Sequence, residues 1–404
     1  MINLKNKRII VGVTGGIAAY KSADLVRRLR EGGAEVRVVM TRGASAFITP
    51  LTMQALSGRP VHTKLLDPGA EAAMGHIELA RWADVIVVAP ASANFMARLA
   101  HGLADDLLAT LCIAAPVPIL LAPAMNRQMW LNPATQDNAG LLQTRGMVLL
   151  GPAEGAQACG DVGPGRMLEP VELIRSLQEQ FETKALAATK VIVTAGPTRE
   201  DIDPVRFISN RSSGRMGYAL ARAAAEAGAD VVLVSGPAAL EAPDRVRLRS
   251  VATAQQMYDA VMGEVDAADI FVAAAAVADY RCRSIADIKI KKATPGLTLS
   301  LEKTPDILAA VANLSRRPFT IGFAAETDDL LANARQKLIN KRLDMIAANK
   351  VGPDMGFEIE QNRLEVLWEG GGVSLDLAPK EKLARQLIRI VAERFHEKNT
   401  AQTH

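Results

Sequence analysis

Two stretches of this chain share one pattern, in which an apolar strand runs into a glycine turn ahead of a helix. Residues 8–13 run into Gly15-Gly16, and residues 190–194 run into Gly196-Pro197. In α/β proteins this arrangement leaves backbone N–H groups free at a helix N-terminus, where they can bind phosphate. Because 404 residues exceed what one hydrophobic core usually supports, the repeat predicts two domains, each with its own anion site.

Each half of the chain alternates short apolar runs with helical patterns, which is typical of parallel sheets covered on both faces. The strand-like runs are residues 9–13, 36–40, 85–89 and 119–122 in the first half, and 190–194, 231–234, 270–275, 319–323 and 345–348 in the second. The predicted fold class is α/β, with two doubly wound parallel-sheet domains at residues 1–189 and 190–404. Ligands of such sheets bind at the carboxyl ends of the strands.

Two segments depart from this alternation. Residues 362–368 and 373–377 predict a hairpin, and a basic amphipathic helix follows from Pro379. Residues 151–167 form a glycine-rich segment that contains Cys159. Long irregular segments in compact domains are often functional, so we predict that this one is a flap over an active site.

Composition limits the class of protein. Cys112, Cys159 and Cys282 are too few for a disulfide framework and suit a reducing compartment, so we expect a cytoplasmic protein. The N-terminus has no signal-peptide pattern, and no apolar run approaches the ~20 residues of a membrane-spanning helix. A net charge of +3 gives no reason to expect nucleic acid or a membrane as a partner.

Motifs in both halves resemble those of known enzymes. Residues 123–130 read Pro-Ala-Met-Asn-Arg-Gln-Met-Trp and match the Pro-x-Met-Asn-x-x-Met-Trp motif of flavin-dependent cysteine decarboxylases. With Gly75-His76 and the loop around Cys159, the first half resembles phosphopantothenoylcysteine decarboxylases. The second half has Asn-Arg-Ser-Ser-Gly at 210–214 and Lys-Ile-Lys-Lys at 289–292, and it resembles phosphopantothenate-cysteine ligases. The order is that of the bacterial bifunctional enzymes of coenzyme A biosynthesis, which implies a flavodoxin-like domain followed by a Rossmann-like ligase domain.

The resemblance implies that the first domain binds FMN and decarboxylates 4'-phosphopantothenoylcysteine by thiol oxidation, CO2 loss and reduction. The implied FMN contacts are Gly15, Gly16, Thr41, Ser92 and Asn94. His76 would act as a base or hydrogen-bond partner in thiol oxidation, Asn126 would hold the substrate carboxylate, and Cys159 would donate a proton.

Simpler roles stay open for these residues. Gly15 and Gly16 can merely turn the chain, and Ser92 can cap a helix. His76 can start a helix, hydrogen-bonded to backbone, and Asn126 can be an Asx cap ahead of Met129 and Trp130.

For the second domain the resemblance implies a ligase that joins L-cysteine to 4'-phosphopantothenate through an acyl-cytidylate, using CTP with Mg2+. The implied CTP contacts are Asp279, Lys289, Pro305, Asp306, Ile307, Leu308, Phe323, Lys337 and Lys341. Asn210 would hold the acyl-cytidylate carbonyl, Lys289 would offset charge at the phosphate, and Arg206 would help bring cysteine. The chain lacks the Gly-x-x-x-x-Gly-Lys-Ser/Thr motif of P-loop proteins, and no carboxylate cluster identifies the Mg2+ ligands.

Alternatives stay open here too. Lys337 and Lys341 lie four apart on a predicted helix, where repulsion of roughly 0.2–0.5 kcal/mol would be relieved by an anion, but they can also form a solvated basic face. Asn210 can cap a helix. Arg206 can form a surface ion pair with Glu200 or Asp201.

Two other functions compete with the bifunctional enzyme. An NAD-dependent oxidoreductase is disfavoured because neither glycine turn reads Gly-x-Gly-x-x-Gly and no acidic residue ends the second strand. A non-catalytic flavin-binding regulatory subunit usually lacks part of the catalytic set or carries a long acidic tail, whereas this chain has His76, Asn126 and Cys159 and ends in a short basic helix. The resemblance further implies a homo-oligomer of flavin-domain trimers and ligase-domain dimers, which together build a dodecamer.

Overall fold

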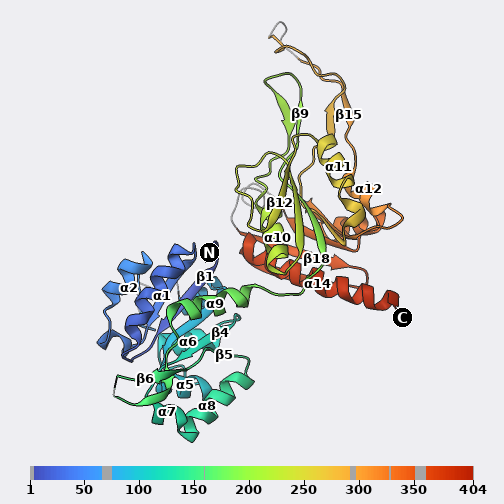
Figure 1. Ribbon diagram of the computed structural model, residues 1–404. Coiled ribbons are helices and arrows are strands. Elements are labelled where there is room, and N and C mark those ends of the chain that lie inside the picture. Colours follow the sequence, from blue (N-terminus) through green and yellow to red (C-terminus); the bar gives the residue numbers. More distant parts are fainter. Residues whose placement is uncertain are drawn as a thin grey trace. The chain divides into compact units, whose positions relative to one another are not determined.

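The computed structural model describes residues 4–65, 75–158, 160–291, 297–326, 329–350 and 361–403 (Figure 1). The chain divides into two compact units, Met1–Phe181 and Glu182–His404. Each unit is built on its own parallel or mostly parallel sheet, so the predicted α/β fold class is confirmed. The predicted boundary between residues 189 and 190 lies several residues beyond this division.

The first unit surrounds a five-stranded sheet. Its elements are β1 (Arg8–Val13), α1 (Ala19–Glu31), β2 (Glu35–Met40), η1 (Ala44–Ala46), α2 (Pro50–Ser57), α4 (His76–Trp82), β3 (Val85–Ala91), α5 (Ala93–Ala100), α6 (Leu107–Ala114), β4 (Ile119–Pro123), α7 (Arg127–Leu131), α8 (Pro133–Thr144), β5 (Val148–Leu149), β6 (Ala153–Ala156), β7 (Val162–Arg166) and α9 (Pro170–Phe181).

All neighbouring strands of this sheet run parallel, in the order β2-β1-β3-β4-β5, which is the order of flavodoxin-like folds. The strands read as continuous apolar runs because both faces of the sheet are buried. In β1, Ile9 packs with Leu25 of α1 and Ile174 of α9 on one face. Ile10 packs on the other face, in a core with Leu108 of α6 and residues of α4, α5 and α8.

The second unit surrounds an eight-stranded sheet. Its elements are β8 (Lys190–Ala195), β9 (Arg199–Asp201), β10 (Phe207–Ser209), α10 (Arg215–Glu226), β11 (Asp230–Ser235), β12 (Val246–Ser250), α11 (Ala254–Met262), η2 (Val265–Ala267), β13 (Ile270–Ala273), β14 (Tyr280–Cys282), β15 (Leu301–Lys303), α12 (Ile307–Ala312), β16 (Phe319–Glu326), α13 (Leu330–Asn340), β17 (Met345–Lys350), β18 (Gln361–Trp368), β19 (Gly371–Pro379) and α14 (Lys380–Thr403).

Six strands of this sheet are parallel, in the order β12-β11-β8-β13-β16-β17, and β18 and β19 extend it antiparallel. Numbered along the chain, the parallel part has the 3-2-1-4-5-6 order of Rossmann folds. Helices α10 and α14 share a core with one face, to which Val191 belongs. Helices α11, α12 and α13 share a core with the other face, to which Ile192 belongs. The predicted hairpin and C-terminal helix are confirmed as β18–β19 and α14.

Three antiparallel strand pairs differ from the sequence-based expectation. The glycine-rich segment predicted as a loop instead contains the hairpin β6–β7. In the second unit, β9 pairs with β10 and β14 pairs with β15, outside the main sheet, and none of these strands was predicted. Figure 1 shows β9 and β15 in extensions of the chain that rise from the body of the second unit. Within the described part of the chain, no helix is long and apolar enough to span a membrane.

Candidate active sites

In the first unit, a threonine links the carboxyl ends of β1 and β3. Thr14 Oγ1 donates to the Pro90 carbonyl at 2.8 Å and accepts from the Ser92 N–H at 2.9 Å. Chain order reverses between these two strands, and in open parallel sheets a ligand crevice forms at such a switch point. Thr14 was not among the site residues predicted from the sequence, although it precedes the glycine turn directly.

The glycine turn itself is shaped for close approach. A Cβ atom at Gly15 would lie 3.0 Å from the Gly43 carbonyl carbon, whereas at Gly16 nothing lies within 4 Å of the same position. Helix α1 begins three residues later, and its Ala19 and Lys21 N–H groups donate to the Gly16 and Ala18 carbonyls, both at 3.0 Å. The backbone is crowded at Gly15 and open at Gly16, just ahead of a helix. This arrangement fits a cofactor that carries a phosphate.

The other predicted FMN contacts lie at neighbouring strand ends. Thr41 follows β2, and its hydroxyl accepts from the Ala44 N–H at 3.3 Å. Ser92 follows β3 and caps α5 by accepting from the Phe95 N–H at 3.3 Å, so the capping role that the sequence left open is present. Asn94 lies in the first turn of α5 and is exposed.

Two of the predicted decarboxylase residues lie at helix N-termini. His76 is the first residue of α4, and Gly75 is the N-cap of that helix. Asn126 caps α7 by accepting from the Gln128 N–H at 2.8 Å, and its amide nitrogen donates to Asp161 Oδ2 at 2.7 Å. The amide thus combines the cap role with a contact to a carboxylate. Cys159 lies outside the described residues.

The β6–β7 hairpin packs on the segment that carries Asn126. The Met125 N–H donates to the Gly165 carbonyl at 2.9 Å, and the Arg127 N–H donates to Gln157 Oε1 at 2.9 Å. Gly165 has φ +141°, and a Cβ atom there would lie 2.4 Å from the Met125 carbonyl oxygen. The hairpin therefore lies against the predicted decarboxylase residues only because position 165 has no side chain.

In the second unit a cavity of about 460 Å³ lies beside the carboxyl ends of β8 and β13. The predicted CTP contacts that line it are Asp279, Pro305, Asp306, Ile307, Leu308, Phe323, Lys337 and Lys341. The lining residues that were not predicted from the sequence are Thr194, Ala273, Ala275, Val277, Tyr280, Lys303 and Thr304. Their positions follow from the crossing of strands distant in sequence, which no local motif signals.

Both helix lysines of this cavity have protein partners. Lys341 pairs with Asp306 at 2.8 Å, and Lys337 Nζ donates to the Phe323 carbonyl at 2.8 Å. Burial alone would raise the pKa of Asp306, but the hydrogen bonds from Lys341 and the Ala309 N–H, together with the charges of Lys341 and Lys337, outweigh it, and the pKa lies below its usual value. These contacts offset the repulsion expected between the two lysines, and Lys341 is the C-cap of α13 rather than an interior helix residue.

Three predicted ligase residues lie outside the lining of this cavity. The Asn210 amide donates to the Val277 carbonyl at 2.9 Å and to the Ala276 carbonyl at 3.3 Å. Arg206 forms an ion pair with Asp203 at 2.5 Å, not with the two carboxylates weighed from the sequence, and donates to the Ile290 carbonyl at 3.1 Å. Lys289 precedes Ile290 on an exposed loop. Asp203 was not selected from the sequence, where nothing distinguishes it from other acidic residues.

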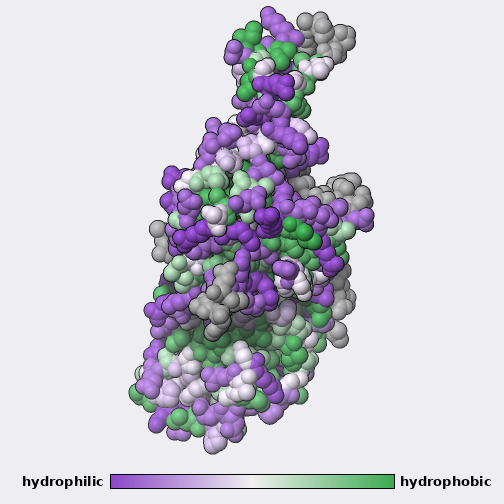
Figure 2. Space-filling model, turned by 90° about the vertical axis from the view of Figure 1, so that its right-hand side faces the viewer, coloured by the Kyte–Doolittle hydropathy of each residue, from purple (hydrophilic) through white to green (hydrophobic). Residues whose placement is uncertain are grey.

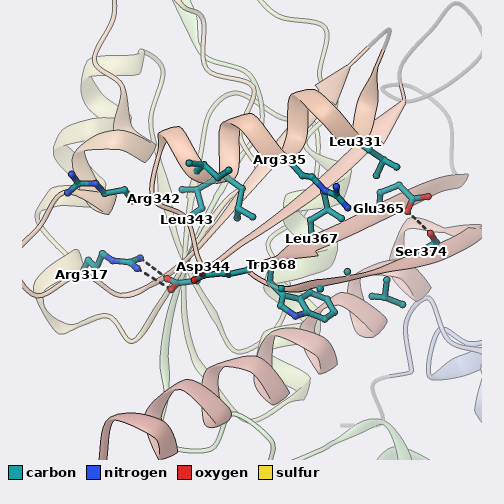
Figure 3. Close-up of a pocket in the computed structure, with 17 residues that line it drawn as sticks. Arg317, Leu331, Arg335, Arg342, Leu343, Asp344, Glu365, Leu367, Trp368 and Ser374 are labelled. Carbon is teal, nitrogen blue, oxygen red and sulfur yellow. Dashed lines mark hydrogen bonds and ion pairs between the residues drawn. The ribbon is translucent and has the colours of Figure 1, made fainter.

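A larger cavity, of about 900 Å³, lies between α13 and the β18–β19 hairpin, and none of the predicted site residues lines it. Figure 3 shows Arg317 and Asp344 paired at one end, and Glu365 bonded to Ser374 at the other. Among the side chains that the structure describes, no group of three or more His, Cys, Asp or Glu could hold a metal ion.

Comparison with known proteins matches the two units separately and the chain as a whole. Residues 2–182 match the family model described as Flavoprotein, and residues 186–395 match that described as DNA/pantothenate metabolism flavoprotein C-terminal domain. The coenzyme A biosynthesis bifunctional protein CoaBC of Vibrio cholerae is 54% identical over 98% of this chain and 100% of its own length. That of Escherichia coli is 51% identical, over 98% and 100%. A crystal structure of the C-terminal domain of CoaBC is 36% identical over 53% of this chain and 100% of that chain, with a TM-score of 0.47.

Proposed function

The chain belongs to the family of coenzyme A biosynthesis bifunctional proteins, and on that premise we propose that it makes 4'-phosphopantetheine in two steps. The second unit joins L-cysteine to 4'-phosphopantothenate through an acyl-cytidylate made from CTP. The first unit then decarboxylates the 4'-phosphopantothenoylcysteine so formed. The observation that carries this proposal is the cavity of the second unit, which gathers residues 279, 305–308, 323, 337 and 341 around one space.

In the ligase step, the chain binds and orients a triphosphate without a P-loop. Lys337 and Lys341 bring positive charge to the cavity wall, and Asp306 keeps Lys341 oriented. Lys289 offsets charge that develops at the reacting phosphate, as preorganised cations do in other phosphate-transfer sites. Asn210 lies next to the cavity wall, where its amide donates to the backbone carbonyls of residues 276 and 277, and the same N–H donors turn to the acyl carbonyl when the intermediate binds. Mg2+ accompanies the triphosphate.

In the decarboxylation step, bound FMN would supply a two-electron acceptor and donor. Such a group is needed because loss of CO2 from an ordinary cysteine carboxylate would leave a carbanion that nothing stabilises. Gly15, Gly16 and the N-terminus of α1 hold its phosphate, and Thr41, Ser92 and Asn94 provide further polar contacts. The contact between Asn126 and Asp161 supports a carboxylate-binding role for this amide. His76 assists loss of the thiol proton, and Cys159 donates a proton late in the reaction.

We also propose that both units self-associate, as trimers of the first and dimers of the second within a dodecamer. Near the glycine turn, Ile17 and Tyr20 are 66% and 64% exposed. In the second unit, Val205, Ile285 and Ile288 are similarly exposed, and Figure 2 shows hydrophobic surface among polar residues on its projecting part, at the top of the view. Exposed apolar clusters of this kind mark interfaces. Free Cys112 and Cys282 support a cytoplasmic location.

The absorption spectrum and two assays test the proposal. The purified protein should show a flavin spectrum, and it should release CO2 from 4'-phosphopantothenoylcysteine. Pyrophosphate should be released from CTP in the presence of 4'-phosphopantothenate, with ATP a poor substitute, and cysteine should complete the ligation. A colourless protein that cannot be reconstituted with FMN, or strong preference for ATP, would overturn the corresponding half. Flavin binding without either activity would support the regulatory subunit instead.

A further inference from the structure

A buried carboxylate lies between β9 and β10 in the second unit. The Asp203 side chain is 0% exposed. Its Oδ1 atom accepts from the N–H groups of Val205 and Arg206, both at 2.9 Å. Its Oδ2 atom accepts from Arg206 Nε at 3.0 Å, from Arg206 Nη2 at 2.5 Å and from the Ile290 N–H at 3.1 Å. Both oxygens are therefore used within the protein, which is what a buried charge requires.

Together, Asp203 and Arg206 hold the peptide groups of a residue far along the chain. The N–H of Ile290 donates to Asp203, and the carbonyl of Ile290 accepts from Arg206 at 3.1 Å. A further bond, from the Ala286 N–H to the Ile202 carbonyl at 3.1 Å, attaches the same loop to the same hairpin. The loop has no regular secondary structure around Ile290, so these bonds fix its path.

Ile290, whose peptide groups are held in this way, lies between two lysines. Lys289 and Lys291 are the neighbours of Ile290, and both are exposed. Pairing with Arg206 holds the pKa of Asp203 below its usual range, and the backbone hydrogen bonds act in the same direction. Asp203 thus already neutralises the Arg206 cation. Arg206 is therefore better suited to holding the loop than to binding a substrate anion by its charge alone.

From this geometry we propose that Asp203 is a positioning residue of the ligase, which acts through Arg206 and the Ile290 peptide to place Lys289 at the nucleotide phosphates. The proposal rests on the proposed ligase function. It also gives Arg206 a role in the first half-reaction, in addition to the contact with cysteine expected from sequence. A displacement of about 1 Å at a reacting group can cost roughly 10²-fold in rate, so a loosened loop should be visible in kinetics.

The first test is structural and independent of activity. Hydrogen exchange of the Ile290 amide is measured in the full-length protein, as purified and with Asp203→Asn. Asparagine has no charge and one oxygen acceptor where Asp203 has two, so the contacts that hold the Ile290 N–H weaken in either orientation of the amide, and exchange at Ile290 should accelerate at least about tenfold. Asp201→Asn, an exposed change on β9, is the matched control and should leave exchange unaltered. Unaltered exchange in Asp203→Asn would overturn the proposal.

The second test is a double-mutant cycle on pyrophosphate release from CTP and 4'-phosphopantothenate, without cysteine. Asp203→Asn should slow release by about 10²-fold while CTP affinity changes less than about threefold, because the cavity is intact. Combined with Lys289→Gln, it should cost nothing beyond Lys289→Gln alone, since both changes remove one function. If the rate losses of the two single variants multiply in the double variant, Asp203→Asn has a general structural effect and the positioning role is refuted.

These experiments distinguish failure of the proposed ligase function from failure of the positioning role. If the parent protein releases no pyrophosphate with CTP, the proposed ligase function fails, whereas the exchange measurement still decides whether Asp203 holds the loop. If Asp203→Asn does not fold, Arg206→Lys replaces it, because lysine cannot bond Asp203 and the Ile290 carbonyl with the same fork. Ile290 exchange should then accelerate similarly, and the absence of that change counts against the proposal.

Discussion

At the scale of single residues, the nucleotide cavity is organised by contacts that exist before any ligand binds. Asp306 caps α12 by accepting from the Ala309 N–H at 3.0 Å, and the same carboxylate pairs with Lys341. The lowered pKa of Asp306 means that this pair is present at neutral pH and is lost only as acidification passes through that lowered pKa. Lys341 is thereby held at the cavity wall by a residue from a different helix.

We predict that Lys341→Gln weakens CTP binding by about tenfold, because it removes a cation from the cavity and leaves Asp306 without its partner. Calorimetric titration of the full-length protein with CTP measures the change. Arg335→Gln is the matched control: it lies on the same helix but lines the other cavity (Figure 3), and it should leave the affinity unchanged. Equal effects of the two substitutions would mean that only overall charge matters.

A second residue-scale prediction concerns Cys112. Burial raises the pKa of this thiol to about 12, with a smaller contribution from Asp106. At pH 8.5 the folded protein should therefore alkylate with iodoacetamide at Cys112 on the order of 10³-fold more slowly than urea-unfolded protein, as followed by mass spectrometry of the peptides. Because the unfolded thiol ionises first, the contribution of Cys112 to stability is full below about pH 8.5 and declines as the pH rises further. Rapid labelling of the native protein would contradict this burial.

At the scale of elements, the β6–β7 hairpin depends on glycines where it meets the Asn126 segment. Gly165 is buried and has both a positive φ and no room for a Cβ atom. A residue with a side chain could not pack there, so glycine at position 165 reflects close backbone approach rather than flexibility alone.

We predict that Gly165→Ala lowers decarboxylation by at least about tenfold while the ligase reaction is unchanged, because the hairpin must move off the Met125 carbonyl. The two activities are assayed separately on the full chain. Gly140→Ala, at an exposed and open position of α8, is the control and should be neutral or stabilising by roughly 0.5–1 kcal/mol. Full decarboxylase activity in Gly165→Ala would mean that the contact is dispensable.

At the scale of the whole molecule, two units with separate cores carry the two predicted chemistries. The two cores that cover the first sheet draw their residues from that unit, as the two cores of the second sheet draw theirs from the second unit. Among the residues that the structure describes, each unit therefore has hydrophobic cores of its own.

We predict that single substitutions separate the activities. Lys289→Gln should lower acyl-cytidylate formation by about 10²-fold or more and leave FMN content and CO2 release normal. His76→Asn should abolish CO2 release and leave pyrophosphate release normal. Both are measured on the full chain with matched substrates. Loss of CO2 release from supplied 4'-phosphopantothenoylcysteine in Lys289→Gln would contradict the two-site model.

Sequence by itself determined the parts of this protein that local chemistry dictates. The apolar runs of β1 and β8, the glycine turns and the hairpin β18–β19 follow from burial on two faces, backbone approach and alternation, each readable over a few residues. The motifs at residues 123–130 and 289–292 pointed to the family for the same reason, since each places its chemistry in one short segment. Only the tertiary structure decided which distant residues meet. The partner of Arg206, the bond that the Ile290 N–H donates to Asp203 across 87 residues and the pairing of Lys341 with Asp306 across 35 depend on how strands and loops cross. Such contacts are fixed by the packing of whole elements, and no local periodicity encodes them.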